Sequence, residues 1–233
     1  MRTYGQYCPI ARGSEVVAER WTPIILRNLL SGSNTFNEIA AGAPGLSRAL
    51  LTRRLRELER AGVLVIRPKP DGHGSLYEPT AAGRDLATVL HALGGWAERW
   101  TELSSEQANP DYVLWSWCRN YMRHDLLPEE RVVVRFEFHQ GKRRINHWLL
   151  IEHHSAEVCR IDPGFGDDVE VVVADPLPFA RWHMGLVSWS AALRSGGIKV
   201  TGRRELCRAL PTWNGGPQVM SDRRASLADS SAG

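Results

Sequence analysis

The chain has 233 residues, of which 43% are hydrophobic and 24% are charged. This length and balance are typical of a globular protein with one large domain or two smaller ones. No run approaches the roughly 20 apolar residues that a membrane-spanning helix needs. The first twenty residues include Arg2, Arg12, Glu15 and Glu19 and lack the apolar core of a secretory signal. We therefore expect a cytoplasmic protein with no membrane partner.

The four cysteines are widely spaced and form no CxxC pair; they are Cys8, Cys118, Cys159 and Cys207. This spacing argues against a zinc site and a disulfide framework, and the sequence predicts no metal and no cofactor. The net charge is +3, and the whole excess lies before residue 104. Residues 46–70 hold seven basic side chains against two acidic ones. Such a focused patch suits a polyanionic partner.

The first third of the chain reads as helical. Residues 15–30 carry an apolar helical stripe despite Pro23. Thr35 is a plausible N-cap for a short helix that runs to Ala41. After a glycine- and proline-rich turn, Ser47 is the expected N-cap of a longer helix that ends at Arg60.

A β-hairpin is predicted next. Residues 63–69 and 76–79 read as strands, and the polar segment between them reads as the tip of the hairpin. Thr80 is then the expected N-cap of a final helix over residues 81–103. Two short helices joined by a tight turn and followed by a hairpin predict a winged helix-turn-helix domain.

The helix over residues 47–60 has two distinct faces. Helical spacing gathers Leu51, Leu55 and Leu58 on one side. The other side is mostly arginine and carries Arg48, Thr52, Arg53, Arg56 and Arg60. Arginine suits both phosphate oxygens and the guanine edge in the major groove. The alternative is a solvated helix whose arginines pair with Glu57 and Glu59.

The position of this helix after a short helix and a turn favours a DNA-reading role. Its N-terminal half would reach bases or adjacent phosphates through Ser47, Arg48, Thr52 and Arg53. Arg56 and Arg60 would touch the DNA backbone, and Thr35 is a further candidate contact. On the hairpin, Lys69 is expected to bind phosphate. His73 has a purely structural role in the turn as its alternative.

Residues from Cys8 to about Leu103 resemble HxlR-type regulators, which are bacterial winged helix-turn-helix proteins. The resemblance rests on these segments: Cys8-Pro9, Glu19-Arg20-Trp21, Phe36-Asn37-Glu38-Ile39, Leu55-Arg56-Glu57-Leu58-Glu59, Thr80-Ala81-Ala82-Gly83 and Trp96. The hairpin tip departs from the usual family pattern. The resemblance implies a homodimer formed through the first and last helices, with double-stranded DNA as partner.

The predicted last helix has an unusually broad apolar surface. A heptad seam runs through Leu86, Leu90, Leu93, Ala97 and Trp100, and a second line runs through Val89, Trp96 and Leu103. The predicted dimerisation residues are Leu86, Leu90, Leu93, Trp96 and Trp100. The alternative is that this face packs on its own domain.

Cys8 is a candidate redox switch, because some relatives use a cysteine at the matching position to sense oxidants or electrophiles. The thiolate is the reactive form, so this role needs nearby cations or a helix start. Arg12 and a helix that begins near Gly13 are the expected sources. The alternative is a thiol without a function.

The polar segment 104–110 predicts a boundary between a DNA-binding domain at 8–103 and a second domain at 111–215, with a disordered tail at 216–233. Strand-like runs cover residues 131–139, 145–152, 157–162 and 168–174. Helical segments follow at 176–184, 188–194 and 203–210. The predicted class is α+β, with a mainly antiparallel sheet and helices late in the chain.

The second domain resembles the sterol-carrier-protein-like fold. The resemblance rests on the first strand, on the strand that runs into Asp175-Pro176, and on the final SAALRSGGIKVTGRRELCRALPTW. It implies an apolar site for a hydrophobic small-molecule effector. The candidate lining residues are Phe136, Phe138, Trp148, Phe179, Trp182 and Trp189. The alternative is that these aromatic residues form an ordinary core.

The sequence therefore predicts a dimeric, sequence-specific transcriptional regulator of the bacterial cytoplasm, found at the nucleoid when bound to DNA. A hydrophobic effector or oxidation of Cys8 would control it. A hydrophobic-ligand carrier that dimerises through the winged domain is the alternative. Enzyme activity is poorly supported: we expect His153-His154 and Asp167-Asp168 to diverge on strands, and no catalytic motif is found.

Overall fold

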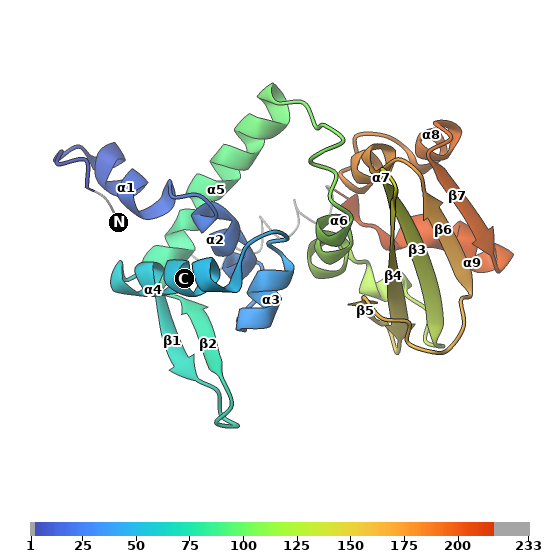
Figure 1. The fold of residues 1–233 in the computed structure, drawn as a ribbon, viewed down its shortest axis with the longest axis horizontal. Coiled ribbons are helices and arrows are strands. Elements are labelled where there is room, and N and C mark those ends of the chain that lie inside the picture. Colours follow the sequence, from blue (N-terminus) through green and yellow to red (C-terminus); the bar gives the residue numbers. More distant parts are fainter. Residues whose placement is uncertain (1–2, 217–233) are drawn as a thin grey trace. The chain divides into compact units, whose positions relative to one another are not determined.

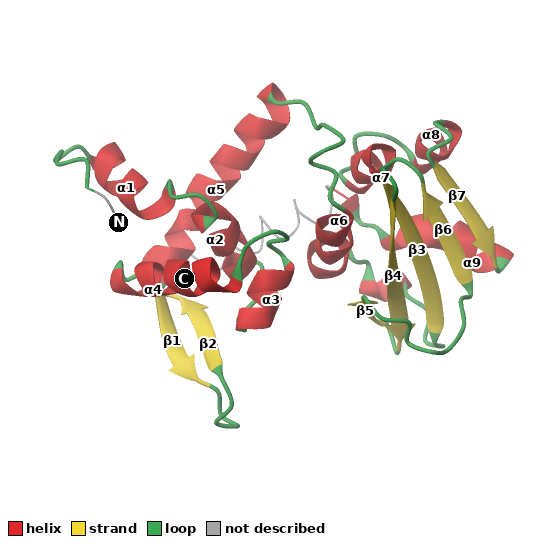
Figure 2. Ribbon diagram, in the orientation of Figure 1, coloured by secondary structure: helices red, strands yellow, loops and turns green. Residues whose placement is uncertain are grey.

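The computed structural model describes residues 3–216. The chain divides into two compact units, residues 1–102 (domain 1) and residues 103–233 (domain 2) (Figure 1). Domain 1 is mainly helical with one β-hairpin, whereas domain 2 combines a sheet with several helices (Figure 2). The α+β class agrees with the sequence prediction. From residue 217 onward, the predicted disordered tail lies outside the described residues.

Domain 1 has the element order of a winged helix-turn-helix. Its elements are α1 (Pro9–Val17), α2 (Thr22–Leu30), α3 (Phe36–Ala41), α4 (Arg48–Arg60), β1 (Leu64–Pro68), β2 (Ser75–Pro79) and α5 (Ala81–Trp100). β1 and β2 pair antiparallel, with Ile66 opposite Tyr77. Tyr77 N also donates to Asn34 O at 2.8 Å, which ties the hairpin to the segment before α3.

The predicted single helix over residues 15–30 is wrong. The structure has α1 and α2 instead, separated by a corner at residues 18–21 in which Trp21 adopts a left-handed conformation (φ 77°). Pro23 explains the break, because proline lacks an N–H and its ring clashes with the carbonyl of the residue four positions earlier in a continuous helix. At the second position of α2 the same residue is well tolerated.

Side-chain caps fix three helix starts that the sequence predicted. Thr35 and Glu38 form a capping box at α3, in which Glu38 N donates to Thr35 Oγ1 at 3.3 Å and Thr35 N to Glu38 Oε2 at 3.1 Å. Ser47 Oγ accepts from Leu50 N at α4, and Thr80 Oγ1 accepts from Gly83 N at α5. These local bonds set the helix boundaries because they satisfy amide groups that the helix itself leaves free.

Gly83 is required for packing. A Cβ atom at this position would lie 2.1 Å from the carbonyl oxygen of Val63, the residue directly before β1. The start of α5 therefore approaches the backbone there more closely than any residue other than glycine allows. The core of domain 1 is formed by Ile25, Leu26, Leu29, Ile39, Leu51, Leu55, Leu58, Val63 and Leu64.

Domain 2 is a five-stranded sheet with helices. Its elements are α6 (Pro110–Ser116), the π-helical η1 (Trp117–Tyr121), the 3-10 helix η2 (His124–Leu126), β3 (Val132–Gln140), β4 (Arg143–Glu152), β5 (Ser155–Cys159), β6 (Val169–Val173), α7 (Pro176–His183), α8 (Trp189–Arg194), β7 (Ile198–Gly202), α9 (Arg204–Ala209) and the 3-10 helix η3 (Leu210–Trp213). The strand order is β5-β4-β3-β6-β7. β3 and β6 pair parallel and the other neighbours antiparallel, so the sheet is mainly antiparallel, as predicted.

The sheet has one buried face and one open face. On β3, Phe136 and Phe138 are fully buried, whereas Arg135 and Glu137 alternate with them on the other side. On β4, the buried residues are His147, Leu149 and Ile151. The buried faces of β3, β4 and β6 and the helices enclose one hydrophobic core.

Two local predictions in domain 2 need correction. α6 and η1 were not predicted, because each segment is too short for a helical period to stand out in the sequence. His153 and His154 were expected on strands but form the tight turn between β4 and β5, with φ angles of 49° and 59°. Two successive positive φ values match the twist of a two-residue hairpin.

Candidate nucleic-acid interface

The exposed face of α4 carries most of the side chains that were predicted to contact DNA. Thr52, Arg53, Arg56 and Arg60 are exposed, as is the first residue of the helix, Arg48. Leu51, Leu55 and Leu58 are buried beneath them. The helix therefore docks on its domain through leucines and presents arginines outward, as the sequence predicted.

The arginines on this face differ in how firmly they are held. The Arg48 guanidinium lies 4.5 Å from the centre of the Phe36 ring and donates to Asn37 Oδ1 at 3.3 Å, so α3 orients it. Arg53 Nε lies 4.0 Å from Glu57 Oε1, and the Arg53 side chain remains 63% exposed. The Thr52 hydroxyl is engaged with the Arg48 carbonyl at 3.0 Å.

Arg54 is the arginine that the sequence analysis left out. It is only 7% exposed, and its guanidinium contacts two carboxylates: Nη1 lies 2.6 Å from Glu57 Oε2, and Nη2 lies 2.7 Å from Glu19 Oε2. A signal was present in the sequence, because Arg54 follows Leu51 by three positions and precedes Leu58 by four, which puts it beside the leucine stripe. Its partner Glu19 lies 35 positions away and could not be inferred from spacing.

The hairpin tip is a closed turn. Lys69 N donates to Gly74 O at 3.1 Å, and His73 N donates to Asp71 Oδ1 at 3.1 Å. Lys69 is half-buried, while the His73 side chain is exposed. The structure also shows a cross-strand ion pair between Arg67 and Glu78 at 3.2 Å, which the sequence analysis did not consider.

The predicted seam on α5 is divided into two parts. Leu86 and Leu90 pack against the core of domain 1, so these two residues serve their own domain. Val89, Leu93, Trp96 and Trp100 are each at least half exposed, with Trp100 at 69%. The reason is length: α5 spans roughly 30 Å, and its second half extends beyond α2 (Figure 1). Exposed apolar residues also occur on the N-terminal segment and α1, where Tyr7 is 96% exposed and Ile10 is 79% exposed.

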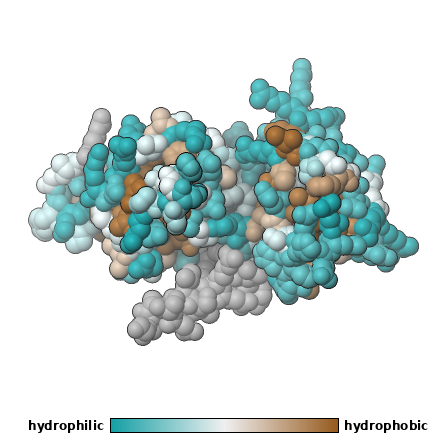
Figure 3. All heavy atoms as spheres, turned by 90° about the horizontal axis from the view of Figure 1, so that it is seen from below, coloured by the Kyte–Doolittle hydropathy of each residue, from teal (hydrophilic) through white to brown (hydrophobic). Residues whose placement is uncertain are grey.

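Hydrophilic side chains cover most of the face shown in Figure 3, with smaller hydrophobic areas on each domain. No helix within residues 3–216 combines the length and apolar character that crossing a bilayer requires. In the same residues, no three His, Cys, Asp or Glu side chains cluster so that they could hold a metal ion.

Cys8 is half-buried and is the N-cap residue of α1, which begins at Pro9. The predicted helix start near Gly13 is therefore wrong by four residues, because Pro9 suits the first position of a helix. The result places Cys8 at a helix N-terminus. In domain 2, burial raises the pKa of the Cys118 thiol to about 12.

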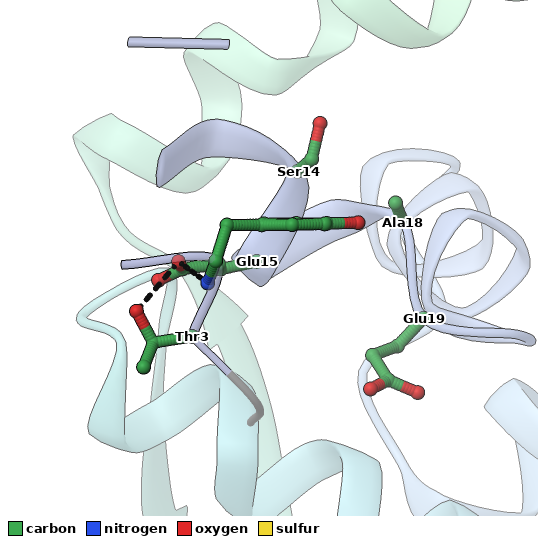
Figure 4. A pocket seen from close by; sticks show the side chains of 6 residues that line it. Thr3, Ser14, Glu15, Ala18 and Glu19 are labelled. Carbon is green, nitrogen blue, oxygen red and sulfur yellow. Dashed lines mark hydrogen bonds between the residues drawn. The ribbon is translucent and has the colours of Figure 1, made fainter. Parts of the chain in front are cut away.

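A small cavity of about 250 Å³ lies beside α1 (Figure 4). Its lining residues are Thr3, Tyr4, Ser14, Glu15, Ala18 and Glu19. Glu15 Oε1 accepts from Thr3 Oγ1 at 2.9 Å and from Tyr4 N at 2.6 Å, which anchors the N-terminal segment to α1. This cavity is unrelated to the aromatic residues that were predicted to line a ligand site.

Five of those six aromatic residues meet in the core of domain 2. Phe136, Phe138 and Trp182 all lie within 6 Å of the Phe179 ring, centre to centre, and Trp182 lies 4.5 Å from Trp189. Trp148 does not join them, because the alternation along β4 turns it to the open face, where its Nε1 donates to Asp167 at 3.2 Å. The inclusion of Trp148 in this set is therefore wrong.

Two buried histidines in this core were not singled out from the sequence. His183 has both ring nitrogens engaged, one with Asn214 Oδ1 and one with Ser116 Oγ, each at 3.2 Å, and burial lowers its pKa to about 4. His147 Nε2 lies 2.8 Å from Asp111 Oδ1, and this bond is the main reason that the pKa of Asp111 is lowered. Two of these partners, Ser116 and Asp111, belong to α6, which was not predicted from the sequence, and this explains the omission.

Comparison with known proteins concerns domain 1. The HxlR-like helix-turn-helix family model matches residues 16–105. The uncharacterized HTH-type transcriptional regulator YvaP of Bacillus subtilis is 35% identical over 101 residues, which cover 42% of this chain and 94% of YvaP. YdeP of the same organism, described in the same words, is 31% identical over 101 residues, or 41% of this chain and 75% of YdeP. The solved structure of reduced YodB from B. subtilis is 27% identical and covers 42% of this chain and 97% of YodB, with a TM-score of 0.37. The chain therefore belongs to the HxlR-like helix-turn-helix family.

Proposed function

We propose that this protein is a transcriptional regulator whose α4 enters the major groove of double-stranded DNA. The observation that carries the proposal is the exposed arginine face of α4, in a domain whose relatives are named as HTH-type transcriptional regulators. In a helix-turn-helix the second helix reads base edges through its N-terminal residues. Arginine can bind guanine through two parallel hydrogen bonds or bind phosphate oxygens.

The proposed contacts follow the position of each residue along α4. Ser47, Arg48, Thr52 and Arg53 lie in its first half or at its N-cap and face bases or the adjacent phosphates. Arg56 and Arg60 bind the phosphate backbone, and Thr35 adds a contact at the start of α3. Lys69 and His73 on the hairpin reach phosphate or the minor groove.

We also propose that the protein acts as a homodimer. The support is a set of exposed apolar side chains on the N-terminal segment, on α1 and on the second half of α5: Tyr7, Ile10, Leu93, Trp96 and Trp100. Exposed aromatic residues are typical anchors of protein interfaces. A two-fold dimer would present two copies of α4 to half-sites about one helical turn apart.

The test is DNA binding by the Arg53→Ala variant of the full chain. The probe is a duplex taken from DNA upstream of the protein's own coding sequence, followed by fluorescence anisotropy. We expect Arg53→Ala to weaken binding about tenfold or more, since a good arginine contact with a base contributes about 1–3 kcal/mol. Arg181→Ala is the matched control, because Arg181 is an exposed helical arginine of domain 2. If Arg53→Ala binds the duplex as tightly as Arg181→Ala does, the proposal that α4 contacts DNA through Arg53 is wrong.

For domain 2 we propose a sterol-carrier-like fold that binds a hydrophobic effector. The support is the order of α8, Gly196-Gly197, β7, Gly202 and α9, together with the aromatic cluster around Phe179. A bound effector would favour one of two conformations of the regulator. Native mass spectrometry of the purified chain tests this by detecting a retained lipid or other apolar molecule. A carrier role would instead leave DNA affinity unchanged when that molecule is removed.

Cys8 is proposed as a redox switch on a separate observation, its place at the N-terminus of α1. A helix N-terminus favours the thiolate over the thiol. Treatment with diamide should change DNA binding by the wild-type chain and leave Cys8→Ser unaffected. The same response in both chains would assign the effect to another thiol.

A further inference from the structure

Arg54 differs from every other arginine of α4 in its burial. It lies beside Leu51 and Leu55 with 7% of its surface exposed, so it is not accessible to DNA. Placing a charge in such a position is costly unless partners compensate for the lost hydration. The compensation comes from Glu57 on α4 itself and from Glu19 in the corner between α1 and α2.

Glu57 is within reach of two arginines. It follows Arg54 by three positions and Arg53 by four, and both spacings allow an ion pair on a helix. The Glu57 carboxylate lies much closer to Arg54 than to Arg53: the nearest Arg54 nitrogen is 2.6 Å from Oε2, whereas Arg53 Nε is 4.0 Å from Oε1. Arg54 thus holds the carboxylate, and the Arg53 side chain stays mostly exposed to solvent.

We propose that Arg54 is a positioning residue for DNA binding: by holding Glu57, it keeps Arg53 free to contact the duplex. This inference rests on the proposed function of α4. Without Arg54, the Glu57 carboxylate would turn to Arg53, its other cationic neighbour, and engage the guanidinium that reads DNA. Glu19 strengthens the arrangement because it holds the second side of the Arg54 guanidinium and fixes its orientation.

A stability role alone would have a different signature. A buried ion pair can often be replaced by an apolar side chain at little cost in stability. Arg54→Met is therefore a suitable variant, since methionine fills a similar volume against Leu51 and Leu55 and leaves no charge buried. If the ion pairs serve only to stabilise the fold, the folded Arg54→Met variant binds DNA as the wild type does, and any change is confined to the melting temperature.

The experiment measures DNA affinity of full-length variants by fluorescence anisotropy on the upstream duplex. We expect Arg54→Met to bind about two- to threefold more weakly than the wild type, because an i,i+4 ion pair between Arg53 and Glu57 contributes only about 0.5 kcal/mol, and Arg54→Met/Glu57→Gln to recover most of that loss. The matched control is Arg54→Met/Glu59→Gln. It removes the same amount of negative charge from α4 but takes it from an exposed side chain that has no contact with Arg54 among the described interactions.

A second comparison uses Arg53→Ala as the background. If Arg54 acts through Arg53, adding Arg54→Met to Arg53→Ala costs no further affinity, which is the signature of coupled residues. Should Arg54→Met fail to fold, Arg54→Leu serves the same purpose, since leucine is also apolar and cannot hold the Glu57 carboxylate.

The inference is overturned by wild-type affinity of Arg54→Met, by a lack of recovery in Arg54→Met/Glu57→Gln, or by a further loss when Arg54→Met is added to Arg53→Ala. Equal recovery by the Glu57→Gln and Glu59→Gln double variants would also overturn it and would assign the effect to net charge. Failure of the proposed function is distinguishable, because Arg53→Ala would then bind DNA as well as the wild type does. If Arg53→Ala loses affinity and Arg54→Met does not, only the present inference fails.

Discussion

Two regions of the molecule are rich in arginine, the exposed face of α4 and the open face of the domain 2 sheet, and they use it differently. On the sheet, Arg135 contacts Asp167 at 2.7 Å, Glu170 at 2.5 Å and Glu137 at 3.5 Å. On α4, Arg53 has a single carboxylate at 4.0 Å. The sheet neutralises its cations internally, whereas α4 leaves most of its cations for a partner.

The difference teaches that arginine content does not by itself mark a polyanion site. What matters is the positive charge that remains after intramolecular pairing, because a paired guanidinium must give up its carboxylate before it can bind phosphate. From the sequence alone, α4 could also be a solvated helix whose arginines form internal ion pairs. Among the described residues, the ion pairs of α4 with N–O distances of 2.6 and 2.7 Å both involve the buried Arg54, and this favours the DNA-binding interpretation.

The largest expected effect distinguishes the two domains that carry these regions and concerns pH, through the buried His183 of α7 in domain 2. The folded-state pKa of His183 is lowered to about 4, so below pH 6.5 the unfolded chain takes up a proton that the folded chain does not. His183 therefore contributes its full stability above pH 6.5, and this contribution falls between pH 6.5 and 4. The shift corresponds to about 3 kcal/mol.

Urea unfolding of domain 2 in the full chain, followed across pH 7 to 4, checks this prediction. His183→Gln should remove that part of the pH dependence, although it lowers stability at pH 7 by breaking the bonds to Ser116 and Asn214. His73→Gln on the exposed hairpin tip is the control and should keep the wild-type slope. An unchanged slope in His183→Gln would show that another group carries the effect.

A smaller effect should come from Arg135→Ala. This substitution leaves Glu137, Asp167 and Glu170 close together without their shared cation, so we expect the free energy of unfolding of domain 2 to fall by about 1–2 kcal/mol. DNA affinity should not change. The matched variant in the other region is Arg56→Ala, which should leave stability within about 0.5 kcal/mol of the wild type and weaken DNA binding. If Arg135→Ala weakened DNA binding and Arg56→Ala lowered stability instead, the two faces would not use arginine in the different ways described above.

The smallest effect is a change in salt dependence. If Arg56 binds a phosphate, Arg56→Ala should reduce the slope of log affinity against log salt concentration by about one. Arg144→Ala on the sheet, where the wild-type side chain pairs with Glu137 at 2.7 Å, should leave this slope unchanged. The measurement is a salt titration of DNA binding by anisotropy with each full-length variant.

Most elements of domain 1 could be predicted because their signals are local. Thr35 with Glu38, Ser47 and Thr80 each begin a helix through bonds to residues within three positions. The two faces of α4 follow from helical spacing alone. Two boundaries were predicted wrongly: the break before Pro23, and the end of α5, which lies at Trp100 and not at residue 103. At both points the apolar helical pattern continues in the sequence, so the pattern gives no sign that the helix ends.

Domain 2 was harder because its site-forming contacts join distant segments. His147 meets Asp111 across 36 positions, and His183 meets Ser116 across 67. The alternation of β3 was evident, but the side taken by Trp148 depends on the register of β4 against β3, where it lies opposite Arg135 on the open face.

By itself the sequence determined where α3, α4 and α5 begin, which side of α4 is apolar, and that its other side is cationic, because these properties depend on neighbours a few residues apart. Only the tertiary structure decided which arginine is withdrawn from that side and which part of α5 remains exposed. Arg54 is buried because Glu19 reaches it from the corner before α2, and Leu86 and Leu90 are covered because α5 crosses its own domain only in its first half. Such outcomes depend on how separate elements pack, and packing partners are not encoded in local spacing.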